Sequence, residues 1–410
     1  MIKRQHLIYC LILGILLYNL FSIPFSIAES SDYYTIDNSV SYHVDVNFTI
    51  SHFNPQPVRH IIKPVIFNCQ GYDKIPYQET SAFKPVIKGT YQLYETTTDQ
   101  FGNGFYHIET ELNEGESFSF SHSYDLTLNL LKPNADSITA EENRNQDEIY
   151  ELYCSSNDSY YLGFHPELIS AAQNIMGYES DPISIAYKVQ KWISTHIKYG
   201  RRDRIYPNPI FGALATYQER QGVCWDMAEL MVTFLRINNI PARMIIGITL
   251  DDLTPTRGEQ FVFYEYWEND TITDYKKIPY HAWVEYYVPS MGWLACDPTW
   301  SDSGTDYFNT LDTIHFRIAG GSWFSLPHFP YYQASHIKFN PFSLKLINFY
   351  NYSFVMTILV TDSPYLDVPL PLILSGIGLF SLAIISISVV SKARKYLSYV
   401  LSRKDLKNLA

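Results

Sequence analysis

The sequence predicts an α+β protein in which an antiparallel β-sandwich precedes a domain of helices packed on an antiparallel sheet. Three observations lead to this fold class. Apolar and polar residues alternate in short runs between residues 31 and 150, as they do in half-buried strands. Helical spacing replaces this alternation after residue 157. Near the C-terminus, an uncharged apolar run at residues 368–390 is long enough to predict a transmembrane helix.

Residues 31–150 are interpreted as an extracellular β-sandwich of the Ig-like type. The alternation is clearest at residues 42–50 and 117–124, and the prolines at 54–57 supply a turn between strands. No cluster of reactive side chains accompanies these strands. We therefore expect a spacer or binding module here, because a fold by itself carries no function.

Residues 157–322 are predicted to form the second domain. Residues 166–176 and 182–197 have the spacing of amphipathic helices, and Pro182 suits the first turn of its helix. A third helix begins at Cys224 and is expected to end at Asn238 and Asn239, before a buried strand at residues 240–248. Its apolar stripe comprises Met227, Leu230, Met231, Phe234 and Leu235.

Cys224 lies at the start of this well-patterned helix. The free amide groups and the positive end of the helix dipole favour a thiolate at such a position. A single cysteine on a helix is nevertheless more often a small core residue than a nucleophile. A catalytic role therefore requires a base and a group that orients the base.

A predicted β-hairpin at residues 281–297 supplies both groups. His281 begins its first strand and Asp297 ends its second strand. Because side chains alternate between faces, the two lie on one face only if the loop or a bulge gives an odd register. Cys296 then points to the opposite face, where a core role suits it better than catalysis. With that register, Cys224 is the nucleophile, His281 the general acid and base, and Asp297 the group that orients His281.

Taken together, these motifs resemble the transglutaminase-like superfamily. The motifs are Gly222-Val-Cys-Trp225, Ile240-Pro-Ala-Arg243, His281-Ala-Trp-Val-Glu285 and Gly292-Trp293 leading to Asp297-Pro-Thr299, and they occur in this order within residues 182–300. The resemblance implies a papain-like core with the nucleophile helix packed on an antiparallel sheet, and it supports the catalytic triad of Cys224, His281 and Asp297. It also implies a thioester intermediate.

The resemblance leaves the reaction open. Attack of a lysine amine on the thioester gives a cross-link, whereas attack of water gives amide or peptide hydrolysis. The superfamily also contains non-catalytic members, so a cell-surface binding or scaffold protein that retains the fold is the alternative. The resemblance names no metal and no cofactor.

Other groups near the thiol are assigned provisional roles. The backbone amide of Cys224 is expected to donate to an oxyanion, with Gln218 or Trp192 as a second donor. Asp226 and Glu229 lie in the first turns of the helix. They are expected to face solvent and stabilise the helix dipole, although their charge could also raise the pKa of the thiol.

The ends of the chain predict where the protein is located. Residues 1–28 resemble a signal peptide or N-terminal anchor, with Lys3 and Arg4 preceding an apolar run. Residues 323–367 are interpreted as a membrane-proximal β segment, followed by the transmembrane helix at 368–390. The tail at 391–410 is basic and is therefore expected to be cytoplasmic. This topology places the catalytic domain outside the cell, where the substrate would be a protein or peptide.

The charge and the cysteines fit an extracellular domain. The chain has a formal net charge of −12 although its tail is basic, so the outer part is acidic and is not expected to bind nucleic acid. Four sequons predict a glycoprotein, at Asn47, Asn157, Asn269 and Asn351. A disulfide between Cys69 and Cys154 is our prediction, although sequence does not fix the pairing. A bridge between Cys224 and Cys296 would remove the nucleophile.

Overall fold

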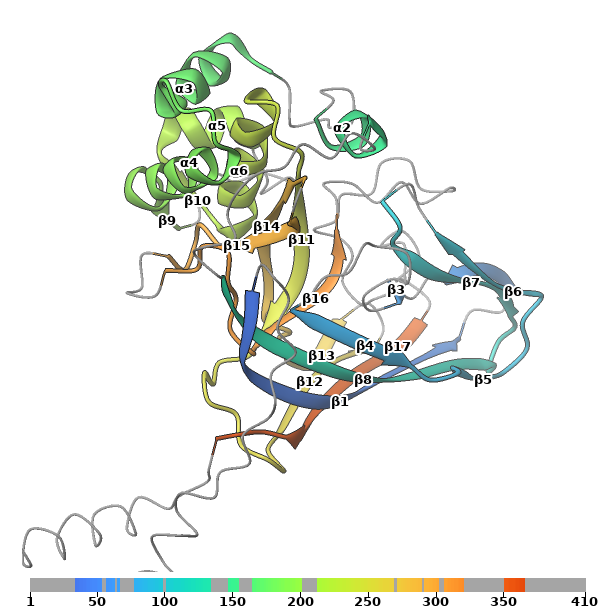
Figure 1. Cartoon of the computed structure of the whole chain (residues 1–410). Coiled ribbons are helices and arrows are strands. Elements are labelled where there is room, and N and C mark those ends of the chain that lie inside the picture. Colours follow the sequence, from blue (N-terminus) through green and yellow to red (C-terminus); the bar gives the residue numbers. More distant parts are fainter. Residues whose placement is uncertain are drawn as a thin grey trace, which may run out of the picture.

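Figure 1 shows the computed structural model of the chain. It describes residues 34–53, 57–62, 65–66, 77–98, 101–133, 147–154, 164–200, 212–268, 271–289, 291–301, 306–320 and 350–365. The predicted signal or anchor at 1–28, the predicted transmembrane helix at 368–390 and the predicted tail at 391–410 lie outside these residues. Within the described ranges, no helix has both the length and the apolar character needed to span a bilayer.

The largest sheet is antiparallel and has seven strands in the order β13-β12-β17-β1-β8-β4, with β5 also paired to β8. Their bounds are β1 (Tyr34–His52), β4 (Gln78–Ala82), β5 (Val86–Lys88), β8 (Ser117–Pro133), β12 (Gln260–Glu268), β13 (Thr271–Lys276) and β17 (Tyr350–Asp362). Alternate residues of β1 are buried, from Val40 to Ile50. This is the period of two that the sequence predicts for a half-buried strand.

This sheet combines strands that are distant in sequence. β17, from the segment predicted to be membrane-proximal, lies between β1 and β12 and pairs with β1 from Ser41↔Asp362 to His52↔Tyr350. β12 and β13 come from the stretch just before the predicted hairpin. The predicted segments 31–150 and 323–367 therefore share one sheet, because strand pairing depends on long-range contacts that a local pattern does not contain.

A second antiparallel sheet packs against one end of the first and completes a β-sandwich. It contains β2 (Val58–Ile62), β3 (Val65–Ile66), β6 (Leu93–Thr98) and β7 (Gly104–Leu112), with β2, β3 and β6 all paired to β7. The shared core consists of Phe48, Ile50, Phe118, Phe120 and Tyr352 from the first sheet and Tyr106, Ile108 and Leu112 from β7. Two antiparallel sheets that face each other are what the alternating pattern predicts.

The third sheet is antiparallel and carries helices on one face, as Figure 1 shows. Its order is β15-β14-β11-β16, with β11 (Ala242–Thr249), β14 (Tyr280–Val288), β15 (Gly292–Cys296) and β16 (His315–Gly320). The helices are α3 (Pro166–Met176), α4 (Pro182–His196), α5 (Gly212–Glu219) and α6 (Cys224–Ile237), and α2 (Asp147–Cys154) contacts α6 and β11. In the helix-covered core, Leu230 and Phe234 of α6 join Met244 and Val284 of the sheet.

The opposite face of the third sheet turns toward the sandwich. Ile245 and Trp283 form a buried cluster there with Tyr77 and Leu131. The hydroxyl of Tyr42 on β1 also donates to the backbone oxygen of Thr313 at 2.7 Å. The α+β class and the helix-on-sheet core are thus as predicted. Buried contacts hold the helix-covered sheet against the sandwich.

Local sequence signals explain where the helices begin and end. Asp181 caps α4 by accepting a hydrogen bond from the backbone nitrogen of Ser184 at 2.7 Å, and Pro182 occupies its first turn. Asn239, with a φ of 56°, follows the end of α6 in the left-handed conformation that often terminates a helix. The three predicted helices therefore agree with α3, α4 and α6 to within one residue.

Cysteine pairing differs from our prediction. Cys154, Cys224 and Cys296 all carry free thiols, so the bridge predicted between Cys154 and Cys69 is not formed; Cys69 itself lies outside the described residues. The absence of a bond between Cys224 and Cys296 leaves the thiol of Cys224 available for chemistry. Of the sequons, Asn47 and Asn351 are exposed on strands, and Asn157 and Asn269 lie outside the described residues.

Candidate active site

Cys224 is the first residue of α6 and follows the short strand β10 (Gln221–Gly222), which pairs in parallel with β9 (Lys198–Tyr199). The backbone nitrogen of Val223 donates to Oδ2 of Asp226 at 3.0 Å, and this bond fixes the turn into the helix. A Cβ on Gly222 would lie 2.6 Å from the Cβ of Asp226, so only glycine fits there. The sequence thus places the thiol at a tightly built helix N-terminus.

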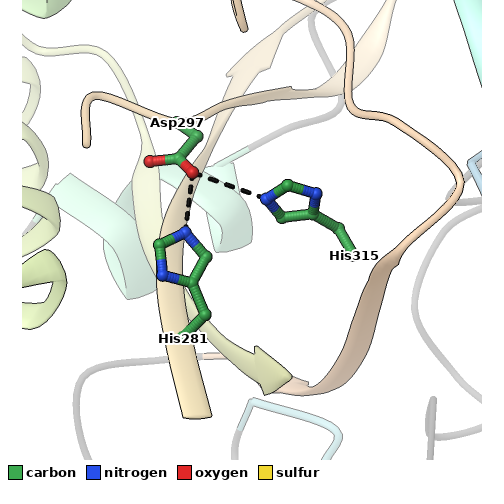
Figure 2. Close-up of side chains that lie close together, drawn as sticks. All are labelled: His281, Asp297 and His315. Atoms are coloured by element: carbon green, nitrogen blue, oxygen red, sulfur yellow. Dashed lines mark hydrogen bonds and ion pairs between the residues drawn. The ribbon is translucent and has the colours of Figure 1, made fainter. Parts of the chain in front are cut away.

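The hairpin has the register that the catalytic hypothesis requires. Glu285 pairs with Ala295 and Tyr287 with Trp293, so odd-numbered residues of β14 and β15 share a face. Figure 2 shows the result: Nε2 of His281 donates to Oδ2 of Asp297 at 2.7 Å. Cys296 points the other way, and its sulfur lies 3.9 Å from that of Met231 in the core under α6. Its predicted core position is confirmed.

Asp297 is fully buried and its carboxylate is held on both oxygens. Oδ1 accepts hydrogen bonds from the backbone nitrogens of Thr299 at 2.8 Å and Trp300 at 3.4 Å. Oδ2 accepts from His281 and from a second histidine, His315, at 3.4 Å. Burial alone raises the pKa of Asp297, but the charge and hydrogen bond of His281 and the hydrogen bond of His315 outweigh it. The carboxylate therefore stays ionised.

His281 is coupled to both of its predicted partners. Burial lowers its pKa, but the charge and hydrogen bond of Asp297, together with a hydrogen bond to Cys224 and the charge of that thiol, raise the pKa to about 10. Because Nε2 already bonds Asp297, Nδ1 is the ring nitrogen left to face Cys224. The structure thus brings Cys224, His281 and Asp297 together: His281 is hydrogen-bonded to Asp297 and lies close enough to the Cys224 thiol for that thiol to raise its pKa. This grouping can hold a thiolate beside an imidazolium.

Sequence reasoning missed His315 and Asp312. His315 is the first residue of β16 and is fully buried beside Asp297, and its Nδ1 lies 2.6 Å from Oδ1 of Asp312. Both residues belong to a stretch in which we recognised no motif. The only sequence signal was a histidine three residues after an aspartate, a spacing common enough to be uninformative without the fold.

His281, Asp297 and His315 also bring three atoms of metal-ligand type within 4.8 Å of one another. Each of these atoms already has a hydrogen-bond partner inside the group. We therefore describe the group as a hydrogen-bonded network. Our expectation that the protein needs no metal or cofactor stays a prediction.

Tryptophans enclose this network. The ring centroid of Trp300 lies 5.3 Å from that of His281, and the Trp283 centroid lies 5.3 Å from that of His315. Trp283 has room because the residue beneath it is Gly247, where a Cβ would lie 2.4 Å from Cη2 of the indole. The rings shield the buried charges from water, which strengthens the interactions between them.

The secondary predictions about this site need correction. Asp226 and Glu229 are buried, with exposed fractions of 3% and 2%, whereas they were expected to face solvent. Burial and the neighbouring charge of Asp226 raise the pKa of Glu229 to about 8. The amide of Gln218 donates to Glu167, and Trp192 is held in a stack with His196 and Tyr217. These contacts do not support either side chain as the second oxyanion donor.

Comparisons with known proteins match the same part of the chain. Residues 169–298 match the sequence model of the transglutaminase-like superfamily. A segment of 84 residues is 33% identical to a protein-glutamine gamma-glutamyltransferase of Pseudomonas aeruginosa and covers 20% of this chain and 11% of that protein. A segment of 198 residues is 21% identical to the uncharacterised protein YebA of Bacillus subtilis and covers 48% of this chain and 22% of that protein. The chain thus spans less than a quarter of the length of these curated relatives.

Two solved structures were also matched. A candidate cysteine protease from Cytophaga hutchinsonii is 17% identical, with a TM-score of 0.48 over 80% of this chain and 93% of that one. The periplasmic domain of TgpA from Pseudomonas aeruginosa is 15% identical, with a TM-score of 0.32 over 63% of this chain and 88% of that one.

Proposed function

Residues 169–298 form a transglutaminase-like domain, and from this premise we propose that the chain is a thiol enzyme that cleaves or transfers protein or peptide amides through Cys224. The observation that carries the proposal is the buried hydrogen bond between Asp297 and His281 beside the thiol at the start of α6. A structural cysteine needs none of these partners.

The proposed chemistry assigns each residue a step. The Cys224 thiolate attacks the carbonyl carbon of the amide, and helix N-terminal amides stabilise the oxyanion that forms. His281 then gives its proton to the departing nitrogen, so an amine or ammonia leaves and a thioester remains. A second nucleophile, which is a primary amine or water, gives a proton to His281 and displaces Cys224. Asp297 keeps the His281 ring oriented and stabilises its cationic form throughout.

The name of one relative supports a first substrate to test. The Pseudomonas protein is named for glutamyl transfer at protein-bound glutamine. We therefore propose the side-chain carboxamide of a glutamine in a protein or peptide as the acyl donor. Such a donor releases ammonia in the first half of the reaction, whichever acceptor completes the second half.

We further propose that this chemistry occurs outside the cell, with the protein attached to the membrane through residues 368–390. The support is the uncharged apolar run followed by a basic tail. In intact cells that express the full chain, a protease added outside should remove the segment around Cys224 and leave the tail protected. Protection of the Cys224 segment, with digestion only after the membrane is opened, would contradict this topology.

The test of the activity uses the full chain in detergent, with a glutamine-rich protein as the acyl donor and ammonia release as the measurement. Cys224→Ala should lower the rate by roughly a thousandfold or more, because it removes the nucleophile. Cys154→Ala is the matched control. Its half-buried thiol is also free, but burial raises its pKa to about 12, so the substitution should leave the rate unchanged.

Adding a fluorescent primary amine separates the two reactions. Incorporation of the amine into the glutamine-containing donor protein identifies acyl transfer to amines, as in cross-linking, whereas ammonia release without incorporation identifies hydrolysis. If the protein does not turn over amides and Cys224 does not react with a thiol-directed peptide amide mimic, the result would instead support the non-catalytic binding role.

A further inference from the structure

Beyond the three residues of the proposed chemistry lies a second acid–histidine pair, in which His315 is buried and Asp312 is partly buried. Figure 2 shows that Asp297 receives two imidazole rings, His281 from one side and His315 from the other. The other ring nitrogen of His315, Nδ1, lies 2.6 Å from Oδ1 of Asp312. Asp312 is in turn held by the hydroxyl of Tyr307, which donates to its Oδ2 at 2.7 Å.

The protonation of His315 follows from these contacts. A neutral imidazole donates from one nitrogen and accepts at the other, whereas an ionised carboxylate can only accept. Both nitrogens of His315 face a carboxylate, so both must carry hydrogen, and the ring is an imidazolium. Burial lowers the pKa of His315, but the charge of Asp312 and the hydrogen bonds to Asp297 and Asp312 raise it above its ordinary value.

The positive charge of His315 weakens the attraction between Asp297 and the proton of His281. Both histidines bond the same oxygen, Oδ2, so the negative charge that His281 meets is shared with His315. The two ring centroids are 5.5 Å apart, and two buried like charges at that distance repel each other. His315 therefore fixes the position of the carboxylate and at the same time weakens its pull on the His281 proton.

We propose that His315 and Asp312 are positioning residues that extend the Cys224–His281–Asp297 chain, with His315 as a permanent imidazolium that holds Asp297 in place and makes His281 a better proton donor to the leaving amine. This inference rests on the proposed function in one respect, which is that Cys224 reacts as a thiolate beside His281. His315 and Asp312 thus support the site without belonging to the three catalytic residues.

The other groups around the pair do not provide the same charge. The titratable neighbours are Cys224 at the start of α6, His281 on β14, Asp297 after β15, Tyr307 and Asp312 in the following loop, and Tyr42 on β1. Burial raises the pKa of both tyrosines, so they stay neutral. Farther along the same strands, Arg317 is paired with Glu285, with Nε and Oε1 3.1 Å apart.

The test is the pH profile of Cys224 alkylation by iodoacetate in the full chain, read by mass spectrometry of the Cys224 peptide. The rate should rise as the thiolate forms and fall at high pH as His281 loses the charge that attracts this anionic reagent. His315→Gln keeps a hydrogen-bond donor to Asp297 but removes the cation. Asp312→Asn removes the carboxylate that keeps His315 charged. Each variant should move the alkaline limb upward by about one pH unit, the size expected when a nearby charge is removed.

His122→Gln is the matched control, since His122 is another buried histidine, in the sandwich, and its loss should leave the profile unchanged. An alkaline limb that stays in place, or moves downward, in a folded Asp312→Asn protein would overturn the proposal. Asp312→Asn decides the matter even if His315→Gln does not fold. A wild-type profile without an alkaline limb also overturns it.

The outcome is separable from that of the proposed function. Shifted alkylation profiles with no amide turnover in the wild type would sustain the positioning role and reject the amide chemistry. Amide turnover in the wild type, together with alkylation profiles that do not shift in the variants, would sustain the amide chemistry and reject the positioning role. For turnover itself, loss of the His315 cation should slow release of the amine, since His281 then holds its proton more tightly.

Discussion

At the residue scale, the site is defined by where protons reside on two buried groups. Asp297 is ionised because two histidines and two backbone amides surround it, and His281 is protonated because Asp297 and Cys224 outweigh the effect of burial. Neither state would exist for the isolated side chain at neutral pH inside a protein core. Each shifted pKa is therefore also a contribution to folding stability.

The pH dependence of stability follows from the directions of these shifts. The pKa of His281 rises from 6.5 to about 10 on folding, so its contribution is complete below about pH 6.5 and is lost as the pH rises toward 10. Asp297 has a lowered pKa, so its contribution is complete above about pH 4 and is lost in stronger acid. Thermal unfolding should show that His281→Gln loses less stability between pH 7 and 10 than the wild type. Parallel curves over that range would contradict the assigned charge.

Gly247 gives a second prediction at this scale. In Gly247→Ala the new Cβ would lie 2.1 Å from the backbone oxygen of Phe316 and 2.4 Å from the indole of Trp283. Strand β16, which carries His315, would have to move, at a cost of at least about 1–3 kcal/mol. We expect a lower free energy of unfolding in urea and slower alkylation of Cys224. Gly258→Ala is the control, because its Cβ meets nothing within 4 Å and only its φ of 89° is strained.

At the element scale, α6 is unusual in burying two acids in its first two turns. The carboxylate of Asp226 accepts a hydrogen bond from the backbone nitrogen of Val223 and so fixes the start of the helix. Glu229 has a pKa of about 8 and is therefore mostly neutral at pH 7, which keeps the helix start from carrying two negative charges beside the thiol. Glu229 therefore contributes to the site by being protonated, and Asp226 contributes by its bond to the backbone of Val223.

Replacing Glu229 tests this account. A carboxyl pKa raised from 4.5 to about 8 on folding costs little near pH 4.5, and it destabilises the fold increasingly as the pH rises to 8, because over this range the unfolded chain ionises while the folded protein stays protonated. Glu229→Gln should therefore match the wild type in melting temperature at pH 5 and exceed it at pH 9. Asp226→Asn should show no such gain, because it weakens the bond that starts the helix. A Glu229→Gln protein that is destabilised equally at both pH values would refute the proposed protonation.

Individual elements also show how far the sequence alone could lead. Apolar spacing predicted α3, α4 and α6, and alternation with a turn predicted the hairpin of β14 and β15. His281 and Asp297 could be proposed because both belong to that hairpin. His315 could not, because it meets Asp297 only when β16 pairs with β11, and that register depends on contacts between distant strands. The placement of β17 beside β1 was beyond a local pattern for the same reason.

At the scale of the whole molecule, the sandwich closes the outer edge of the catalytic sheet. β16 is the last strand in the order β15-β14-β11-β16, so the polar backbone groups on its outer side need partners. The side-chain amide of Gln78 supplies them at Arg317. Its nitrogen donates to the backbone oxygen of Arg317 at 2.9 Å, and its oxygen accepts from the backbone nitrogen of Arg317 at 2.7 Å. Asn103 does the same at Gly320, with bonds of 2.8 Å and 2.9 Å. Two side-chain amides thus take the place of a neighbouring strand.

This arrangement predicts that the sandwich stabilises the site from a distance. Gln78→Ala or Asn103→Ala would leave a buried nitrogen and a buried oxygen of β16 without these partners, at a cost of about 1–3 kcal/mol for each variant. Because β16 begins at His315, alkylation of Cys224 should also slow in Gln78→Ala. Urea unfolding and the alkylation rate are the measurements, with Gln218→Ala as the control, since its amide bonds Glu167 at an exposed position. If Gln78→Ala behaved like Gln218→Ala in both measurements, the sandwich would be an independent module and not a support for β16.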